Sequence, residues 1–200
     1  MNTHQKVVGI VGSYRKNGVI DSAVTEILEA AATEGAETKK IYLQDRHIEF
    51  CTNCRVCMEE PGLERGKCVL RDDMDKILQE IESADSLVIG APVNFGNINA
   101  LTQQFLERCV CYGYWPTDAA TPQIRNPNPK KKSVLVSSSA APAWMGRLLT
   151  GAIGTLKYLS KMLGAKPIGV LWVGLVKPKD IQLSDTIRQR AKQLGRKLAV

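Results

Sequence analysis

The sequence lacks a long uninterrupted apolar run. Its first apolar segment begins at Val7 and ends at Gly12, and the longest uncharged stretch, residues 86–106, is broken by proline, asparagine and glutamine. A membrane-spanning helix needs about 20 apolar residues, and a secretory signal needs an apolar region of roughly 7–15 residues. We therefore expect a soluble cytoplasmic protein without a membrane partner.

Histidine is scarce, and several common catalytic and nucleotide-binding patterns are missing. The chain has two histidines and no Ser-His-Asp order, so hydrolysis has no support. Neither the pattern Gly-x-x-x-x-Gly-Lys-Ser/Thr nor the pattern Gly-x-Gly-x-x-Gly occurs. These absences argue against a P-loop enzyme and against the standard dinucleotide-binding turn.

Acidic residues are scarce in the last third of the chain. Residues 130–200 carry 14 basic and 2 acidic side chains, residues 1–129 carry 13 and 18, and the formal net charge is +7. No recognition-helix, zinc-finger or aromatic RNA-binding motif accompanies the basic residues, so we expect no nucleic-acid partner. The charge predicts either a solvated basic face or a rim that attracts a phosphorylated cofactor such as NADPH.

The sequence does contain a regular alternation of strand and helix patterns. Its 200 residues fit one domain, residues 1–200. Short apolar runs predict strands at residues 7–11, 38–43, 87–90, 133–136 and 168–173. Apolar residues at helical spacing predict helices at residues 24–35, 74–81, 101–109, 148–163 and 183–198. Because parallel strands need helical crossovers, we predict an α/β fold: a doubly wound, five-stranded parallel sheet with helices on both faces.

Two long loops interrupt this alternation. A cysteine-rich loop spans residues 47–71, and an irregular, proline-rich loop spans residues 112–132. Structureless loops of this length in a compact domain are usually functional. The irregular loop is predicted to be either a lid or partner contact, or a surface excursion.

The loop after the first predicted strand, residues 12–18, has the composition of an anion site. Ligands of open α/β sheets bind at the carboxyl ends of the strands, where a helix N-terminus offers N–H groups to a phosphate. Ser13 and Asn17 add polar side chains, Arg15 adds a positive charge, and Gly18 lets the backbone approach closely. The alternative is a polar turn that caps the helix.

The loop after the third predicted strand, residues 90–97, lies beside the first loop in this topology. Its small residues and its two glycines permit a flat ring to lie against the backbone. Backbone N–H groups there can meet the edge of a flavin and tune its electronic properties. A strand-ending turn explains the same residues without a ligand.

Four cysteines are crowded into 18 residues as Cys51-x-x-Cys54-x-x-Cys57 followed by Cys68. Disulfides are not expected in a reducing compartment. The compact spacing suits a [4Fe–4S] cluster better than zinc, which favours two separated pairs. Cys109 and Cys111 lie at a helix end and are predicted to be packing residues.

Four motifs in sequence order together resemble a known family. They are Gly12-Ser13-x-Arg15-Lys16-Asn17-Gly18, Cys54-x-x-Cys57, Gly66-Lys67-Cys68-Val69 with Asp72-Asp73-Met74, and Ala91-Pro92-Val93-x-Phe95-Gly96-Asn97. These motifs are similar to those of the NADPH-dependent FMN reductase and iron–sulfur flavoprotein branch of the flavodoxin-like superfamily. The similarity extends from Val7 to about Arg108.

The resemblance implies an FMN site. It implies that the phosphate is held by Ser13, Arg15, Asn17 and Gly18, that the isoalloxazine is flanked by Pro92, Val93, Asn94, Phe95 and Gly96, and that its far side is bordered by Ser137, Ser138 and Ser139. The chain departs from the family at Asn94, where tyrosine is common. Asp21 would repel a phosphate, so we expect its side chain to turn away. No side-chain acid or base is demanded, so no catalytic residue is predicted.

The resemblance also implies an activity. We expect an FMN-dependent oxidoreductase that takes hydride from NAD(P)H and passes electrons to a quinone, a nitro or azo compound, a flavin or a metal acceptor. Its partners are then a nicotinamide cofactor and a small-molecule acceptor. Family members are expected to be homodimers or homotetramers, and the loop around Trp115 is the predicted subunit contact.

Two other functions remain open. The first is an iron–sulfur flavoprotein that passes single electrons from ferredoxin through a [4Fe–4S] cluster on Cys51, Cys54, Cys57 and Cys68 to FMN. Because related proteins with similar cysteines work with flavin alone, these residues are either cluster ligands or free thiols. The second is a flavodoxin-like electron carrier without turnover, which the sequence pI of about 9.1 disfavours because flavodoxins are strongly acidic.

Overall fold

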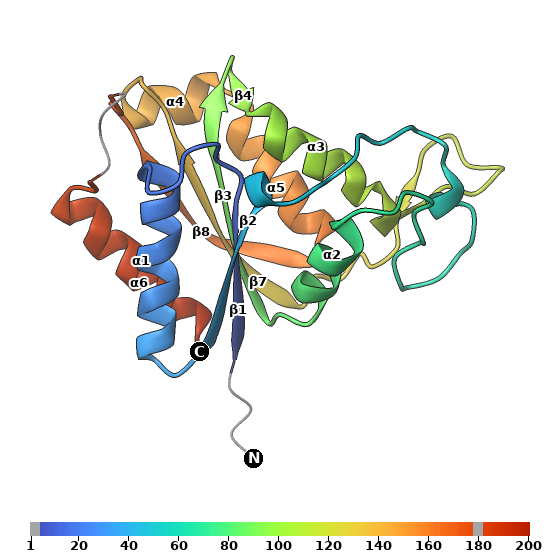
Figure 1. Ribbon diagram of the computed structural model, residues 1–200, viewed down its shortest axis with the longest axis horizontal. Helices are drawn as coiled ribbons and strands as arrows, with labels where there is room; N and C mark the ends of the chain where they lie inside the picture. Colours follow the sequence, from blue (N-terminus) through green and yellow to red (C-terminus); the bar gives the residue numbers. More distant parts are fainter. Residues whose placement is uncertain (1–4, 178–181) are drawn as a thin grey trace.

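The protein is built around a central parallel sheet. A computed structural model describes residues 5–177 and 182–200, and the five parallel strands lie in the order β2-β1-β3-β7-β8 (Figure 1). A short strand, β4, pairs antiparallel with β3, and β5 and β6 form a separate hairpin. The strands are β1 Lys6–Val11, β2 Glu37–Tyr42, β3 Ser86–Asn94, β4 Asn97–Ile98, β5 Gly113–Tyr114, β6 Gln123–Ile124, β7 Lys131–Ser138 and β8 Ala165–Val173.

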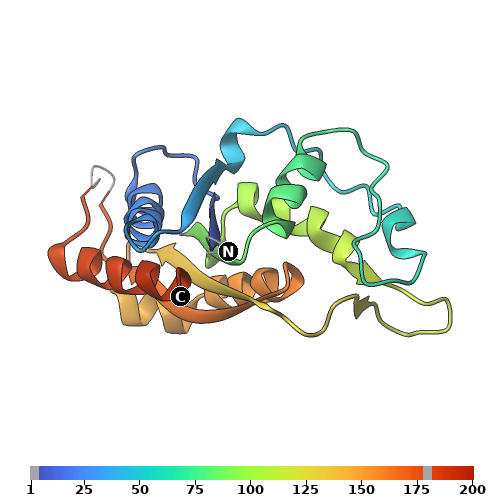
Figure 2. The ribbon, with the colours of Figure 1, turned by 90° about the horizontal axis from the view of Figure 1, so that it is seen from below.

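Helices cover both faces of the sheet. Helices α1 and α6 pack together on one face, and α2, α3 and α5 cover the other (Figures 1 and 2). Among the described residues, no helix is long and apolar enough to cross a bilayer. The α-helices are α1 Val19–Thr33, α2 Met74–Glu82, α3 Ala100–Arg108, α4 Ala143–Leu149, α5 Ala152–Met162 and α6 Asp185–Leu198. The 3₁₀ turns are η1 Leu43–Asp45, η2 Val56–Met58 and η3 Cys109–Tyr112.

The apolar residues of β1 show why this layered arrangement forms. Successive side chains of a strand point to opposite faces. Val7 and Val11 belong to the core beneath α1 and α6, whereas Val8 and Ile10 belong to the core beneath α2, α3 and α5. A strand that is apolar on both sides is therefore buried between two helical layers. This confirms the predicted α/β class and its five-stranded parallel sheet.

Several element boundaries differ from the prediction, and two of these differences lie beside the candidate ligand loops. The helix expected at residues 148–163 is two helices, α4 and α5, because Thr150 is extended (φ −119°, ψ 152°) and the Gly151 N–H donates to the Gly96 carbonyl. The third strand does not end at residue 90. It continues to Asn94 and turns back into β4, so Pro92 lies in a strand rather than a loop. A hydrogen bond from a distant segment overrides the local pattern in the first place, and pairing with β7 and with the adjacent strand β4 does so in the second.

The two long loops lie side by side at one end of the molecule (Figures 1 and 2). The backbone N–H of Trp115 donates to the Met58 carbonyl (3.0 Å). The Arg125 guanidinium donates to the carbonyls of Cys57 (3.0 Å) and Gly62 (3.3 Å). Residues 112–132 contain the β5–β6 hairpin, and through these hydrogen bonds they support the cysteine-rich loop. The Trp115 ring lies beneath the Arg55 guanidinium, 4.4 Å from its centroid.

Candidate functional site

The candidate site is the edge of the sheet at which β1 and β3 end, which we call the crevice because ligands of open α/β sheets bind in a crevice at this position. β1 and β3 are neighbours in the sheet, but the next strands lie on opposite sides of this pair. The chain continues from β1 to β2 toward one edge of the sheet and from β3 to β7 toward the other edge. Ligands of open α/β sheets bind at this kind of topological switch point, and FMN does so in the strand order 2-1-3-4-5. The loops that the sequence predicted as phosphate and ring sites both border this crevice.

Gly12, at the end of β1, is held by groups from β3 and α3. Its N–H donates to the Gly90 carbonyl (2.7 Å), and its carbonyl accepts from Asn99 Nδ2 (2.7 Å) and Thr102 Oγ1 (3.1 Å). Asn99 is also the N-cap of α3, accepting from the Thr102 N–H at 3.2 Å. Both side chains are buried. The start of α3 therefore fixes the loop of residues 12–18, which we call the phosphate loop after its predicted ligand, relative to β3. Asn99 and Thr102 were not predicted as site residues, although an asparagine directly before a helical pattern is an N-cap signal.

Replacing Thr102 with valine is expected to raise the dissociation constant for FMN about tenfold. The change keeps the side-chain shape but removes one of the two side-chain donors of the buried Gly12 carbonyl, which keeps its bond from Asn99, and a hydrogen bond of this kind contributes roughly 0.5–1.5 kcal/mol. Thr33→Val is the control, because the Thr33 hydroxyl only donates to the Glu29 carbonyl on the surface of α1. Fluorescence titration with FMN and urea unfolding of both variants measure the effect. Equal FMN affinity in the two variants would contradict this role for Thr102.

The predicted phosphate residues cluster in the loop between β1 and α1. The Ser13 side chain is buried and its Oγ accepts from the Arg15 N–H (3.1 Å), while Arg15 itself is exposed. Asn17 adopts the left-handed conformation (φ 57°) that asparagine tolerates. Gly18 is the N-cap of α1, and no side chain caps the helix. The first N–H groups of a helix lack intrahelical partners, so they are donors for an anion.

Asp21 ties this loop to the end of β2. Its carboxylate accepts from Lys40 Nζ (2.8 Å), the Tyr42 hydroxyl (3.1 Å) and the Asn17 N–H (2.7 Å). Burial raises the pKa of Asp21, but hydrogen bonds from Lys40 and from the Asn17 backbone outweigh burial and lower it. The charge that we expected to repel a phosphate is thus paired with an ammonium group. The pattern of the second strand did not point to Lys40 or Tyr42 as part of this site.

The predicted ring-binding residues form the β3–β4 hairpin. Pro92 and Val93 are half-buried, whereas Asn94, Phe95 and Gly96 are exposed. Phe95 (φ 46°) and Gly96 (φ 79°) are the two central residues of the turn, and both have the positive φ of a type I′ hairpin. The hairpin thus presents its tip at the rim of the crevice.

The three predicted serines lie at the end of β7, in register with β3. Ala91 pairs with Ser137, and Pro92 pairs with Ser138. The Ser137 hydroxyl donates to the Ala91 carbonyl (2.9 Å), and the Ser139 hydroxyl donates to the Ala141 carbonyl (2.9 Å). All three serines are buried, and these bonds place β7 along the side of β3 where the hairpin begins.

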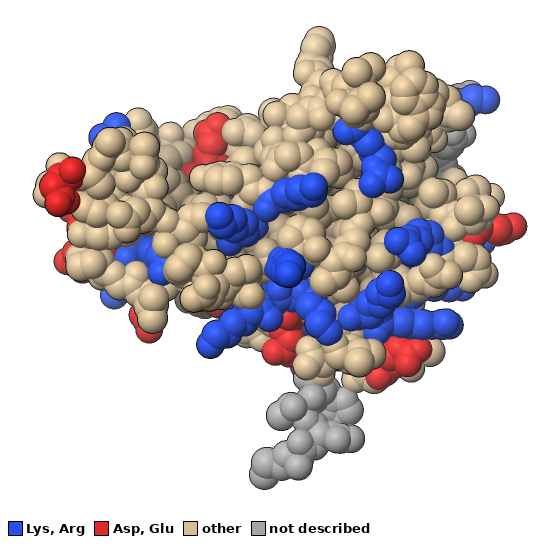
Figure 3. Space-filling model, turned by 180° about the vertical axis from the view of Figure 1, so that it is seen from behind, with Lys and Arg blue, Asp and Glu red and all other residues tan. Residues whose placement is uncertain are grey.

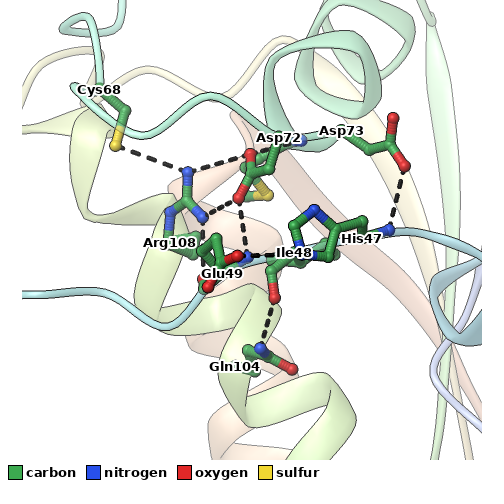
Figure 4. Close-up of polar contacts among 9 residues, drawn as sticks. His47, Ile48, Glu49, Cys68, Asp72, Asp73, Gln104 and Arg108 are labelled. Atoms are coloured by element: carbon green, nitrogen blue, oxygen red, sulfur yellow. Dashed lines mark hydrogen bonds and ion pairs between the residues drawn. The ribbon is translucent and has the colours of Figure 1, made fainter.

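A buried ion pair organises the cysteine-rich loop at the other end of α3. Arg108 binds Asp72, and the side chains of both are nearly inaccessible, at 2% and 1% exposure (Figure 4). Arg108 also donates to the Glu49 carbonyl (2.8 Å) and to Cys68 Sγ (3.5 Å). The Asp72 carboxylate also accepts hydrogen bonds from the backbone N–H groups of Glu49 (to Oδ2, 2.8 Å) and Met74 (to Oδ1, 3.0 Å). The pair therefore joins the start and the end of this loop to α3.

The four clustered cysteines belong to one loop, but their side chains do not surround a common metal-binding point. Cys57 is buried, Cys54 is exposed, and Cys51 and Cys68 are partly buried. Burial and the nearby thiols of the other three cysteines raise the pKa of Cys57. No three cysteine, histidine, aspartate or glutamate side chains among residues 5–177 and 182–200 converge on a metal-binding point. The structure as it stands therefore does not fit a cluster without movement of these side chains.

Cys109 and Cys111 are buried packing residues, as the sequence predicted. Cys109 lies in the core, where burial raises its pKa well above the usual range, and burial raises the pKa of Cys111 to about 12. Their burial in the core is what a packing role requires.

Comparison with known proteins places the chain among flavin-dependent oxidoreductases. Residues 5–165 match the NADPH-dependent FMN reductase family. An iron-sulfur flavoprotein of Archaeoglobus fulgidus is 30% identical over 194 residues, which cover 97% of this chain and 79% of that protein. An iron-sulfur flavoprotein of Methanocaldococcus jannaschii is 41% identical over 103 residues, which cover 52% of this chain and 51% of that protein. An NAD(P)H:quinone oxidoreductase from Methanothermobacter marburgensis has the same fold, with a TM-score of 0.70 at 15% identity over 98% of both chains.

The strand order and the fold it shares with this oxidoreductase define a flavodoxin-like α/β fold. Within that class, the chain belongs to the NADPH-dependent FMN reductase family. This confirms the resemblance found in the sequence and its activity class, an FMN-dependent NAD(P)H oxidoreductase.

Proposed function

We propose that the crevice between β1 and β3 binds FMN, and that the chain uses it to oxidise NAD(P)H and to reduce a small-molecule acceptor. The observation that carries this proposal is the fit of the phosphate loop. Gly12 has no space for a side chain, since a Cβ there would lie 2.0 Å from Thr102 Oγ1 and 3.2 Å from the Gly90 carbonyl. The loop is therefore held against β3 while the uncapped start of α1 faces its other end.

Each group of residues has a distinct role in this proposal. Ser13, Arg15, Asn17 and Gly18 bind the phosphate, together with the first N–H groups of α1. The hairpin residues Pro92, Val93, Asn94, Phe95 and Gly96 lie along the ring, and Ser137, Ser138 and Ser139 border its far side. When bound, FMN supplies the hydride and electron chemistry. The protein binds and orients it, and no side chain is assigned as acid or base.

The domain organisation, the cellular location and the assembly of the protein are also part of this proposal. We propose that residues 1–200 form a single domain, that the protein is cytoplasmic, and that it assembles as a homodimer or homotetramer. A non-enzymatic carrier is disfavoured by the net charge of +7, because flavodoxins are strongly acidic.

Reconstitution tests the proposed activity. The purified chain is expected to bind one FMN and then to oxidise NAD(P)H steadily when ferricyanide is added. Binding is followed by the quenching of flavin fluorescence, and turnover is followed by the loss of absorbance at 340 nm. Binding without turnover would support the carrier, and absence of FMN binding would overturn the proposal.

A second candidate function is electron transfer through an iron–sulfur cluster. The observation that favours it is the compact spacing Cys51-x-x-Cys54-x-x-Cys57, followed by Cys68, in which Cys57 is buried and the other three cysteines are at least partly accessible. Asn53 and Arg55 also adopt left-handed conformations (φ 54° and 66°) between these cysteines, and such alternation of backbone conformation exposes N–H groups at many iron–sulfur sites. In this function, ferredoxin would be the electron donor.

Anaerobic purification separates the two candidates. If the cysteines hold a [4Fe–4S] cluster, the chain is expected to contain four iron and four sulfide ions and to absorb broadly near 400 nm. Cys57→Ser should then lose both iron and sulfide, whereas the matched variant Cys109→Ser should retain them. Iron-free protein with full NAD(P)H oxidation would identify the cysteines as free thiols.

A further inference from the structure

A buried carboxylate lies beside the loop to which we assign the flavin phosphate. Asp21 is 2% exposed and stands in the first turn of α1. Its Oδ2 accepts from the Asn17 N–H at 2.7 Å, so this negative charge is in direct contact with the phosphate loop. The start of a helix favours one anion through its N–H groups and its dipole. A second anion at the same place repels the first unless a cation neutralises it.

Lys40, on the neighbouring strand β2, is the cation that meets this carboxylate. Its Nζ donates to Asp21 Oδ1 (2.8 Å) and to Thr25 Oγ1 (2.7 Å). The Tyr42 hydroxyl also donates to Asp21 (3.1 Å), and the Tyr42 ring centroid lies 4.9 Å from Lys40 Nζ. Burial lowers the pKa of Lys40, but hydrogen bonds with Asp21 and Tyr42 outweigh burial and raise it. Because hydrogen bonds also lower the pKa of Asp21, both groups are charged at neutral pH and their charges cancel.

The positive charge of the chain as a whole does not replace Lys40. The formal net charge is +7, but Lys and Arg side chains gather on the face that is turned away in Figure 1 (Figure 3), whereas α1 and β2 lie on the near side (Figures 1 and 2). Exposed charges more than about 8–10 Å apart are largely screened at physiological ionic strength. Within the phosphate loop, Lys16 is itself paired with Asp45 at 2.7 Å. Local ion pairs therefore set the electrostatic potential at this loop.

We propose that Lys40 is a specificity-determining residue: by neutralising Asp21, it lets the site select FMN, which carries a phosphate, over riboflavin, which carries none. This inference rests on the proposed function and gives a role to a residue outside the phosphate loop. Asp21 holds Asn17 in its left-handed conformation (φ 57°), and Lys40 removes the repulsion that this support would otherwise cause. Lys40 is thus a positioning residue that acts through Asp21.

Two single variants with opposite expected effects test this role. In Lys40→Met, the Asn17 N–H and the Tyr42 hydroxyl still donate to Asp21, so the carboxylate keeps its charge and repels the phosphate. The ratio of the Kd of riboflavin to the Kd of FMN is expected to fall about tenfold. In Asp21→Asn, the amide oxygen still accepts from Asn17 while Lys40 stays positive, so this ratio should rise about threefold.

Fluorescence titration of the flavin-free chain with each flavin gives both dissociation constants. The titrations are done at about pH 8, because a phosphate monoester with a second pKa of about 6 is then a dianion. Riboflavin has the ring of FMN without the phosphate, so its affinity reports the ring contacts alone. Urea unfolding shows whether each variant is folded, and Asp21→Asn decides alone if Lys40→Met is unfolded.

Two further variants separate charge from structure. Asp21→Asn/Lys40→Met has no charge at either position and should return the ratio to near its wild-type value. Lys39→Met is the matched control, because Lys39 precedes Lys40 in β2 but pairs with Glu80 (2.6 Å), and it should leave the ratio unchanged. The difference between Lys40→Met and the wild type should also shrink in about 1 M KCl, where the Debye length is about 3 Å. Salt would not restore a distorted loop.

The outcomes separate this inference from the function on which it rests. If both single variants weaken the binding of FMN and riboflavin equally, the network is only structural and the inference is overturned. An unchanged ratio in both single variants overturns it as well. Wild-type protein that binds neither flavin overturns the proposed function instead.

Discussion

Gly12→Ala is expected to weaken FMN binding at least about 100-fold. The new Cβ would lie 2.0 Å from Thr102 Oγ1, a distance that real atoms do not adopt, and 3.2 Å from the Gly90 carbonyl. The start of α3 or the phosphate loop must therefore shift, and forced overpacking of this kind also costs typically 1–3 kcal/mol of stability. Because the loop sets the position of the phosphate donors, a shift of about 1 Å misplaces them all.

Gly154→Ala is the matched control for this change. Gly154 lies in α5, where a Cβ meets no atom within 4 Å. Alanine favours a helix by roughly 0.8–1.0 kcal/mol over glycine, so this variant should be slightly more stable and should bind FMN normally. Fluorescence titration gives the FMN affinity of each variant, and urea unfolding without FMN gives the stability. A folded Gly12→Ala protein with wild-type affinity would place the phosphate elsewhere.

Arg108→Met is expected to cost about 3–5 kcal/mol of stability, the usual effect of leaving one partner of a buried ion pair alone. Asp72 would keep its contacts with the N–H groups of Glu49 and Met74 but would lose the guanidinium. The cysteine-rich loop should consequently detach from α3 and become accessible to proteases. Urea unfolding and limited proteolysis measure the two effects.

The stability loss of Arg108→Met should depend on pH in a defined direction. Burial alone raises the pKa of Asp72, but hydrogen bonds from Arg108 and from two backbone N–H groups outweigh burial and lower it. In the wild type, Asp72 thus stabilises the fold above its unfolded pKa of about 3.9, and this contribution is lost as pH falls through the lower folded pKa. Without Arg108, burial shifts the pKa upward. The difference in the free energy of unfolding between the wild type and Arg108→Met should therefore be largest at pH 7 and shrink as the pH falls toward 4.

Two further variants make the ion-pair prediction specific. Arg188→Met removes a more exposed arginine that pairs with Glu26 (2.9 Å), and surface pairs are worth about 0–1 kcal/mol. Asp72→Asn/Arg108→Met removes both charges and should be more stable than Arg108→Met alone, since no buried charge is left unpaired. A double variant as unstable as the single one would mean that shape, not charge, holds the loop.

The order of the sheet and the position of the crevice were predictable because they depend on local patterns. Continuous apolar runs such as Val7–Val11 predict strands that are buried on both faces, and helical spacing between them predicts crossovers. Parallel crossovers are right-handed, so few topologies remain. The loops after the first and third strands then lie together at the switch point.

The lining of the crevice was only partly predictable. Ser13, Arg15 and Asn17 follow a strand directly, and their residue types already favour an anion. Asn99, Thr102 and Lys40 contribute through contacts that span 87, 90 and 19 residues along the chain. No local pattern encodes contacts over such separations, so their roles became visible only in the fold.

The sequence by itself determined the layered α/β class, the family and the two loops that border the crevice, because strand burial, helix periodicity and the loop motifs are properties of neighbouring residues. Only the tertiary structure decided where β3 ends, that α4 and α5 are separate, and that Arg108 joins both ends of the cysteine-rich loop. These features depend on hydrogen bonds and buried charges between distant segments, whose strength is set by the burial that folding itself creates.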